Sequence, residues 1–124
     1  TLTYKQKIKS DMHEVNIDIL AGSDFLLVTG IADSSHLVEF LKSKTLTFKH
    51  LEYSDHYNFS KPSIDRIRSL SSGKKILTTE KDFGRLKPKI SDRDIYYIEV
   101  SMYFNSELNE FNFDETISEY INND

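Results

Sequence analysis

The sequence contains no cysteine and no tryptophan, and only four glycines and two prolines occur among its 124 residues. Without cysteine the chain has neither disulfides nor thiolate ligands for a metal, which fits a reducing compartment. None of the glycines belongs to a Gly-rich run that ends in Lys and Ser or Thr. The sequence therefore lacks the loop that cradles phosphates in P-loop nucleotide-binding proteins.

Blocks of one charge and long apolar runs are also scarce. The net charge is −4, and acidic and basic residues alternate, so the chain has no basic block of the kind that binds nucleic acid. Apolar runs such as residues 25–28 are far shorter than the roughly 18 residues that a membrane-spanning helix needs. We expect no nucleic-acid partner and no membrane span within this sequence.

The apolar segments that are present alternate between two types. Continuous or β-branched apolar runs, typical of strands buried on both faces, occupy residues 25–29, 45–53, 75–79 and 94–100. Helical spacing or capping signals mark residues 34–41, 60–70, 82–86 and 113–121. This alternation predicts an α/β three-layer sandwich, in which a mainly parallel four-stranded sheet carries helices on both faces.

Residues 1–24 differ from the rest of the chain. They are polar and irregular, and only residues 3–8 alternate weakly between polar and apolar side chains. We expect this segment to form an edge strand or an N-terminal linker ribbon, and residues 25–124 to form the α/β domain.

The first polar motif, Ser54-Asp55-His56-Tyr57, follows a predicted strand. A carboxylate beside an imidazole can fix its tautomer or help to hold its proton. Adjacent residues of an extended chain point to opposite sides, so a turn after Tyr53 is needed to direct both toward one cleft. In the alternative interpretation Asp55 caps a turn and His56 is half exposed. The dipeptide alone favours this alternative, because such pairs are common in loops.

The second motif is Thr78-Thr79-Glu80-Lys81-Asp82, at the end of another predicted strand. Its hydroxyls, carboxylates and ammonium group could grip a phosphate or orient a water molecule. Alternatively, Thr79 is a helix N-cap and the acids oppose the helix dipole in the first turn. The spacing does not decide between these interpretations.

The remaining candidates are weaker. Gly30, after Thr29, allows the backbone to turn tightly and to approach a partner closely, but one glycine is not a phosphate loop. His13, His36 and His50 have no metal-ligand spacing, so we expect structural or surface roles for them and no metal site.

Taken in order, three segments resemble the lipid A 4'-kinase family, also called tetraacyldisaccharide 4'-kinase. Residues 27–32 resemble the family's strand that ends in Ser/Thr-Gly-Ile, and residues 53–59 resemble its Asp-His-His/Tyr segment. Residues 76–82 match its Thr-Thr-Glu-Lys-Asp signature, which is the most specific of the three. The resemblance covers approximately residues 25–100.

The resemblance implies part of an ATP-dependent P-loop kinase of lipid A biosynthesis. Such enzymes phosphorylate the 4'-hydroxyl of lipid A disaccharide 1-phosphate at the cytoplasmic face of the Gram-negative inner membrane. Their N-terminal domain holds the phosphate loop, the Mg²⁺ site and the membrane-docking helix. We therefore expect residues 1–24 to lead toward such a domain in the same polypeptide, which would bind ATP and Mg²⁺. We expect the chain alone to bind neither and to be inactive.

The resemblance also implies roles for individual residues. The family's counterpart of His56 pairs with an aspartate of the N-terminal domain that helps to remove the proton from the attacking sugar hydroxyl. Asp55 would orient His56, and Lys81 is best suited to touch phosphate or to pair with an acid of the other domain. The residues expected to line the cleft near the nucleotide or phosphate are Thr29, Gly30, Thr78, Thr79, Glu80, Lys81 and Asp82.

Two other functions compete with a kinase domain. The first is a non-catalytic α/β binding or interaction module, in which the acids and Lys81 are capping and surface groups. The second is a receiver-like phosphoacceptor, which needs acids clustered at the end of its first strand. Asp24 precedes that strand here and Asp33 follows it at a distance, so this option ranks low.

Overall fold

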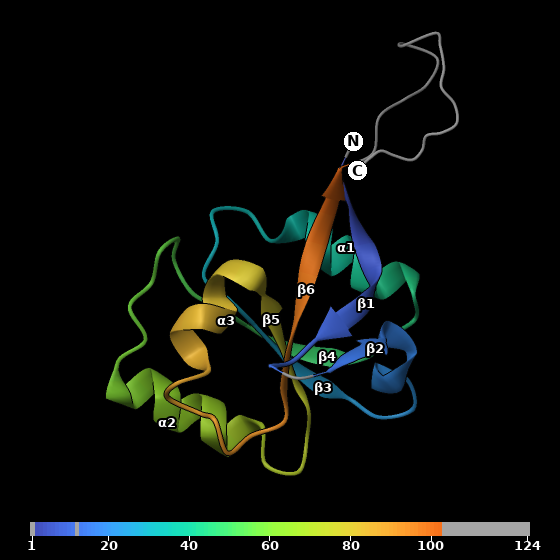
Figure 1. Cartoon of the computed structure of the whole chain (residues 1–124). Coiled ribbons are helices and arrows are strands. Elements are labelled where there is room, and N and C mark those ends of the chain that lie inside the picture. Colours follow the sequence, from blue (N-terminus) through green and yellow to red (C-terminus); the bar gives the residue numbers. More distant parts are fainter. Residues whose placement is uncertain (1, 12, 103–124) are drawn as a thin grey trace, which may run out of the picture.

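The computed structural model describes residues 2–11 and 13–102. Six strands, three α-helices and one 3-10 helix occur in this part of the chain (Figure 1). In order they are β1 (Leu2–Lys9), β2 (Glu14–Asn16), η1 (Ile17–Leu20), β3 (Phe25–Thr29), α1 (Ser35–Ser43), β4 (Phe48–Glu52), α2 (Lys61–Leu70), β5 (Ile76–Thr79), α3 (Glu80–Leu86) and β6 (Ile95–Met102). The helix expected at residues 113–121 lies outside the described residues.

All six strands belong to one sheet, in the order β2-β1-β6-β5-β3-β4. The pairs β3–β4, β3–β5 and β5–β6 are parallel, which confirms the predicted four-stranded parallel sheet. Strand β1 pairs antiparallel with β6 on one side and with β2 on the other. Residues 2–9 are therefore an internal strand of a larger sheet, although their weak alternation indicated only an edge strand or ribbon.

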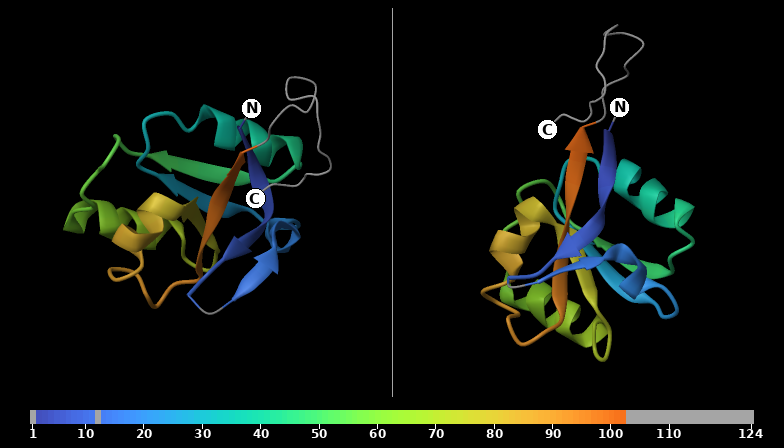
Figure 2. Two further views of the ribbon diagram at one scale, coloured as in Figure 1. Left: turned by 45° about the horizontal axis from the view of Figure 1, so that its top comes forward. Right: turned by 45° about the vertical axis from the view of Figure 1, so that its right-hand side comes forward.

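The sheet is the middle of three layers, as predicted (Figures 1 and 2). All five residues of β3 are buried, and their side chains alternate between the two faces. Phe25 and Leu27 pack in the core shared with α1, whereas Leu26 and Val28 pack in the core shared with α2 and α3. Burying each such side chain contributes about 1.5–3 kcal/mol, which explains the continuous apolar run.

The N-terminal segment belongs to the first of these cores. Tyr4 and Ile8 of β1 and Ile17 and Leu20 of η1 are buried beside α1. In the sequence these residues are separated by lysines and other polar residues, which hides their common face. No helix in residues 2–11 or 13–102 has both the length and the hydrophobicity to cross a bilayer.

Local signals place the helices where they were expected. Ser60 is the N-cap of α2, and Pro62 lies in its first turn, where a missing N–H breaks no helical hydrogen bond. Asp33 accepts a 2.9 Å hydrogen bond from the backbone N–H of Ser35 at the start of α1. Because β3, β4 and β5 are parallel, the loops that follow them leave the sheet on the same side, at the carboxyl ends of the strands. We call this side the carboxyl edge of the sheet.

Candidate functional site

The carboxyl ends of β3 and β5 form a topological switch point. These strands are neighbours, but β3 leads to α1 on one face of the sheet and β5 leads to α3 on the other. In open α/β sheets such divergence leaves a crevice in which ligands bind. Here the side chain of Asp82, from the first turn of α3, reaches across it to the backbone of Gly30 after β3.

Asp82 is fully buried, and its hydrogen bonds join the start of α3 to the end of β3. We call these contacts among Gly30, Thr79 and Asp82 the clasp. Asp82 Oδ2 accepts a 2.8 Å hydrogen bond from the Gly30 N–H and a 2.7 Å hydrogen bond from the Thr79 hydroxyl. The Asp82 N–H donates in return to Thr79 Oγ1, at 3.1 Å. Thr79 is therefore the N-cap of α3, as the capping interpretation predicts, and Asp82 adds a tie to the end of β3.

Gly30 joins the two polar motifs. Its N–H donates to Asp82, and its carbonyl accepts a 3.1 Å hydrogen bond from the His56 N–H. A Cβ at this position would lie 3.1 Å from Asp82 Oδ1 and 3.4 Å from the Ser54 carbonyl oxygen. The contact with Asp82 Oδ1 is tighter than most Cβ contacts in proteins, so a larger residue here would force the buried Asp82 carboxylate to shift.

The loop after β4 makes the turn that the first motif needs. The Tyr57 N–H donates to the Ser54 carbonyl at 3.1 Å, and His56 adopts a left-handed φ of 59° between them. Tyr53 and Tyr57 stack with ring centroids 4.6 Å apart, and Phe59 packs edge-on against both. The backbone of the loop is thus held while the His56 side chain, 66% exposed, projects from the rim.

Two charged groups flank the His56 ring. Its Nε2 lies 3.6 Å from Asp55 Oδ2, within ion-pair range but beyond hydrogen-bond length. Its Nδ1 lies 3.1 Å from Nη2 of Arg85, and Nη1 of Arg85 lies 3.6 Å from Asp82 Oδ1. Arg85 was not among the predicted site residues. The available signal was its position three residues after Asp82 on a short helix, which places both on one face.

The other predicted residues divide into buried and exposed groups. Thr29 and Thr78 are fully buried. Thr29 Oγ1 lies 2.8 Å from His50 Nε2, and the Thr78 hydroxyl donates to the Val28 carbonyl at 2.6 Å, so neither hydroxyl lines an open cleft. Glu80 and Lys81 are exposed on the first turn of α3.

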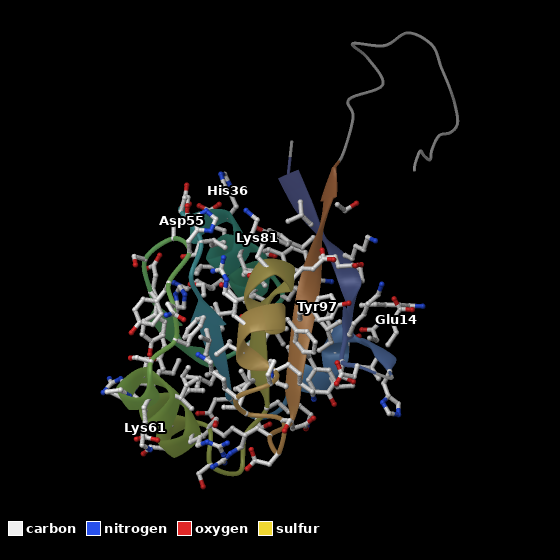
Figure 3. All side chains as sticks on the ribbon, turned by 60° about the vertical axis from the view of Figure 1, so that its left-hand side comes forward. Glu14, His36, Asp55, Lys61, Lys81 and Tyr97 are labelled. Atoms are coloured by element: carbon white, nitrogen blue, oxygen red, sulfur yellow. The ribbon has the colours of Figure 1, made fainter. Side chains whose placement is uncertain are left out.

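These positions all lie toward one end of the molecule. Figure 3 shows Asp55, Lys81 and His36 at this end, whereas Lys61 of α2 lies at the opposite end. Asp55 comes from the β4–α2 loop, Lys81 from α3 and His36 from α1. Ionisable side chains from three separate segments thus lie at the carboxyl ends of the strands.

A second polar group at this edge was not anticipated. The Ser34 hydroxyl donates a 2.6 Å hydrogen bond to Glu52, beside the contact between Thr29 and His50. Burial lowers the pKa of His50, because desolvation disfavours the charged imidazole, while nearby Glu52 opposes this effect. The group ties the edge strand β4 to β3 and α1.

Within the part of the chain that the structure describes, the candidate residues do not gather into a cluster of metal ligands. In residues 2–11 and 13–102, no three His, Asp or Glu side chains are placed to ligate one metal ion. His13 and His36 are exposed, and the sequence has no phosphate loop. A cavity of about 290 Å³ lies at the amino ends of β3, β5 and β6. Lys74 and Asp24 at its rim form an ion pair at 3.1 Å.

The sequence model of the tetraacyldisaccharide-1-P 4'-kinase (LpxK) family matches residues 1–120. The chain belongs to this family. It is 32% identical over 120 residues to a tetraacyldisaccharide 4'-kinase of Flavobacterium psychrophilum, which covers 97% of this chain and 34% of that protein. A tetraacyldisaccharide 4'-kinase of Bacteroides thetaiotaomicron is 38% identical over 85 residues, or 64% of this chain and 22% of its own length.

A solved structure supports the fold. The crystal structure of LpxK from Aquifex aeolicus in complex with ATP superposes with a TM-score of 0.59 at 22% sequence identity, covering 89% of this chain and 33% of that one. The chain thus spans about a third of the length of the LpxK structure and of its Flavobacterium relative.

Proposed function

We propose that this chain is the C-terminal domain of an ATP-dependent kinase that phosphorylates the 4'-hydroxyl of lipid A disaccharide 1-phosphate. Membership of the kinase family supports this, as does a match to only about a third of a longer relative. In this proposal residues 25–124 contribute the parallel strands of the α/β domain, and β1, β2 and η1 of the N-terminal segment complete its sheet and core. Residues 1–24 lead toward an N-terminal P-loop domain of the same polypeptide. Their first strand, β1, pairs antiparallel with β6 and so also belongs to the sheet of this domain.

His56 supplies this domain's part of a split active site. The observation that carries the proposal is an exposed imidazole at the carboxyl edge of the sheet, whose backbone is tied to Gly30 and whose ring contacts Arg85. We propose that His56 orients a carboxylate of the P-loop domain, which accepts the proton of the sugar hydroxyl. Asp55, 3.6 Å from the ring, helps to orient the imidazole. A positioned base contributes about 10²–10⁴-fold to the rate.

The nucleotide lies mainly against the other domain. ATP with Mg²⁺ supplies the transferred phosphoryl group and the charge neutralisation that dominate catalysis of phosphoryl transfer. This chain has no phosphate loop and, in its described residues, no metal-ligating set, so it adds groups from the rim. Lys81 is the exposed cation best placed to touch phosphate or to pair with an acid of the other domain. Glu80 shares this exposed turn.

The buried residues of the two motifs shape the rim from within. Gly30, Thr79 and Asp82 close the crevice between β3 and β5, and Thr29 and Thr78 bond neighbouring strands. The kinase would work in the cytoplasm, at the face of the inner membrane, and it would reach the membrane and its lipid A precursor through the other domain.

The split site predicts that the isolated chain is inactive and that His56 is needed in the full-length kinase. We expect the purified chain neither to hydrolyse ATP nor to phosphorylate the disaccharide. In the full-length protein, His56→Ala should lower kcat by up to the roughly 10²–10⁴-fold that a positioned base contributes, because the carboxylate that it orients remains. The matched control is His36→Ala, which removes another exposed histidine from the same end of the molecule and should leave turnover unchanged.

Circular dichroism and thermal melting would show whether each variant folds. Turnover by the isolated chain would refute the split site. Normal turnover by a folded His56→Ala kinase would instead favour a non-catalytic binding or interaction module.

A further inference from the structure

The contact between Arg85 and His56 assigns a hydrogen to one ring nitrogen. Nη2 of Arg85 lies 3.1 Å from Nδ1 of His56. A guanidinium group has five N–H donors and no acceptor, so Nδ1 must be the acceptor. A neutral imidazole that accepts at Nδ1 carries its hydrogen on Nε2. This geometry therefore selects the Nε2–H tautomer.

The selected tautomer leaves a donor available at the rim. Nε2 lies 3.6 Å from Asp55 Oδ2, which is too long for a hydrogen bond. The Asp55 carboxylate therefore attracts the Nε2–H electrostatically but does not form a hydrogen bond with it. A carboxylate that approaches from outside can accept that hydrogen, because the side chain of His56 is 66% exposed.

Arg85 is itself held in place. Its Nη1 lies 3.6 Å from Oδ1 of Asp82, which is fully buried. This oxygen accepts no hydrogen bond from the described residues. The other oxygen, Oδ2, is fixed by the Gly30 N–H and the Thr79 hydroxyl. The Arg85 side chain is 36% exposed. Its guanidinium group lies between the buried carboxylate of Asp82 on one side and the His56 ring on the other.

We propose that Arg85 is a positioning residue, which holds His56 as the Nε2–H tautomer and aims that N–H toward the carboxylate of the P-loop domain. This inference rests on the proposed function, in which His56 pairs with such a carboxylate. Asp82 anchors Arg85, so the buried end of the Thr-Thr-Glu-Lys-Asp signature supports the exposed histidine of the other motif. Arg85 acts through His56 and touches neither substrate nor phosphate.

The first test measures the tautomer in the 124-residue chain, independently of catalysis. NMR chemical shifts of the ring nitrogens, recorded on histidine-labelled chain at alkaline pH, report which nitrogen carries the hydrogen. His56→Gln identifies the His56 signals. We expect the Nε2–H form in the wild type and in Arg85→Lys, whose ammonium is also a donor only. Arg85→Glu should reverse the preference toward Nδ1–H, since a carboxylate can only accept.

The matched control is Arg66→Ala, which removes an exposed arginine of α2 and should leave the His56 signals in place. If Arg85→Glu folds and keeps the Nε2–H form, the assignment of Arg85 is wrong. Should that variant fail to fold, Arg85→Ala serves instead. Its His56 signals should shift toward a mixture of tautomers, and unchanged signals would overturn the proposal.

The second test is kinetic and uses the full-length kinase. Arg85→Ala should lower kcat by about 10–100-fold, the usual effect of removing a group that orients a functional imidazole. The KM for ATP should stay constant, and Arg85→Lys should recover part of the loss. In a His56→Ala background, Arg85→Ala should cost nothing further, because both changes disable one unit.

The two tests separate this inference from the proposed function. A full additional loss from Arg85→Ala in the His56→Ala background, with a raised KM for ATP, would show that Arg85 contacts phosphate directly and would overturn the positioning role. A change of tautomer without a change in kcat, while His56→Ala remains inactive, would overturn that role as well. Full turnover of His56→Ala would remove the proposed function itself, whatever the NMR measurement shows for Arg85.

Discussion

Removing the Asp82 carboxylate should destabilise the chain more than removing any exposed acid of the same helix. In Asp82→Ala the buried Gly30 N–H loses its acceptor, which costs about 1–3 kcal/mol. The first turn of α3 also loses an acid that opposes the helix dipole, worth about 0.3–1 kcal/mol. We therefore expect the free energy of unfolding to fall by about 1–4 kcal/mol.

The control is Glu80→Ala, in the same first turn of the helix. Glu80 is exposed and shares only the interaction with the helix dipole, so its loss should cost about 0.3–1 kcal/mol. Asp82→Asn should fall between the two, because the amide oxygen can still accept from Gly30 while the charge is lost. The comparison thus separates the hydrogen bond from the charge.

The measurement is urea-induced unfolding followed by circular dichroism, with the slope m compared between variants. In thermal melts the Asp82→Ala change corresponds to a loss of roughly 5–16 °C, at about 4 °C per kcal/mol for a domain of this size. If Asp82→Ala is no more destabilising than Glu80→Ala at equal m, Asp82 does not clasp β3 to α3. If Asp82→Asn costs as much as Asp82→Ala, the charge is more important than the Gly30 acceptor.

Two further predictions concern the same edge of the sheet. Because burial lowers the pKa of His50, the unfolded chain binds its proton more readily, so stability should fall as the pH drops below about 6.5. His50→Asn should flatten the dependence of the urea midpoint between about pH 6.5 and 5, and an unchanged slope would contradict this assignment. Gly30→Ala should destabilise the chain, because its Cβ meets Asp82 and Ser54. Its control, Gly84→Ala within α3, meets nothing within 4 Å and should stabilise by up to about 1 kcal/mol; an equal effect of both in thermal melts would refute the crowding at Gly30.

The parts of the fold that local chemistry determines were predictable from the sequence. The buried run at residues 25–29 became the internal strand β3, and Ser60 and Thr79 occupy the N-cap positions of the helices that follow β4 and β5. These features depend on residues that are close together in the chain. The alternation of strands and helices was enough to predict the parallel sheet, because crossover connections leave few alternatives.

The N-terminal strand was harder to predict because its core residues carry no local period. Tyr4 and Ile8 lie four residues apart, a spacing that also suits a helix, and the ladder between β1 and β6 shifts register between them. Their burial depends on Ile98 of β6, which lies 90 or more positions later in the sequence. Contacts at such separation leave no signal in a short window.

The candidate site was predictable only in part, for a similar reason. The sequence indicated a turn at Asp55-His56 but not the positive φ of His56 or its bond to Gly30. Arg85 was missed because its contact with His56 joins residues 29 positions apart. The two threonines that precede Glu80 differ in a way that the sequence does not show, since Thr79 caps α3 while Thr78 points into the sheet.

The closed crevice explains why the two motifs occur together. At the switch point between β3 and β5, where an α/β protein ordinarily binds its ligand, the carboxylate of Asp82 accepts a hydrogen bond from the Gly30 N–H. A domain built in this way can offer chemistry only from groups that project beyond the clasp, and His56 is such a group. The same Asp82 holds Arg85 against that histidine. The capping and catalytic interpretations of the two motifs are therefore compatible, because the buried residues of one motif fix the position from which the exposed residue of the other can act.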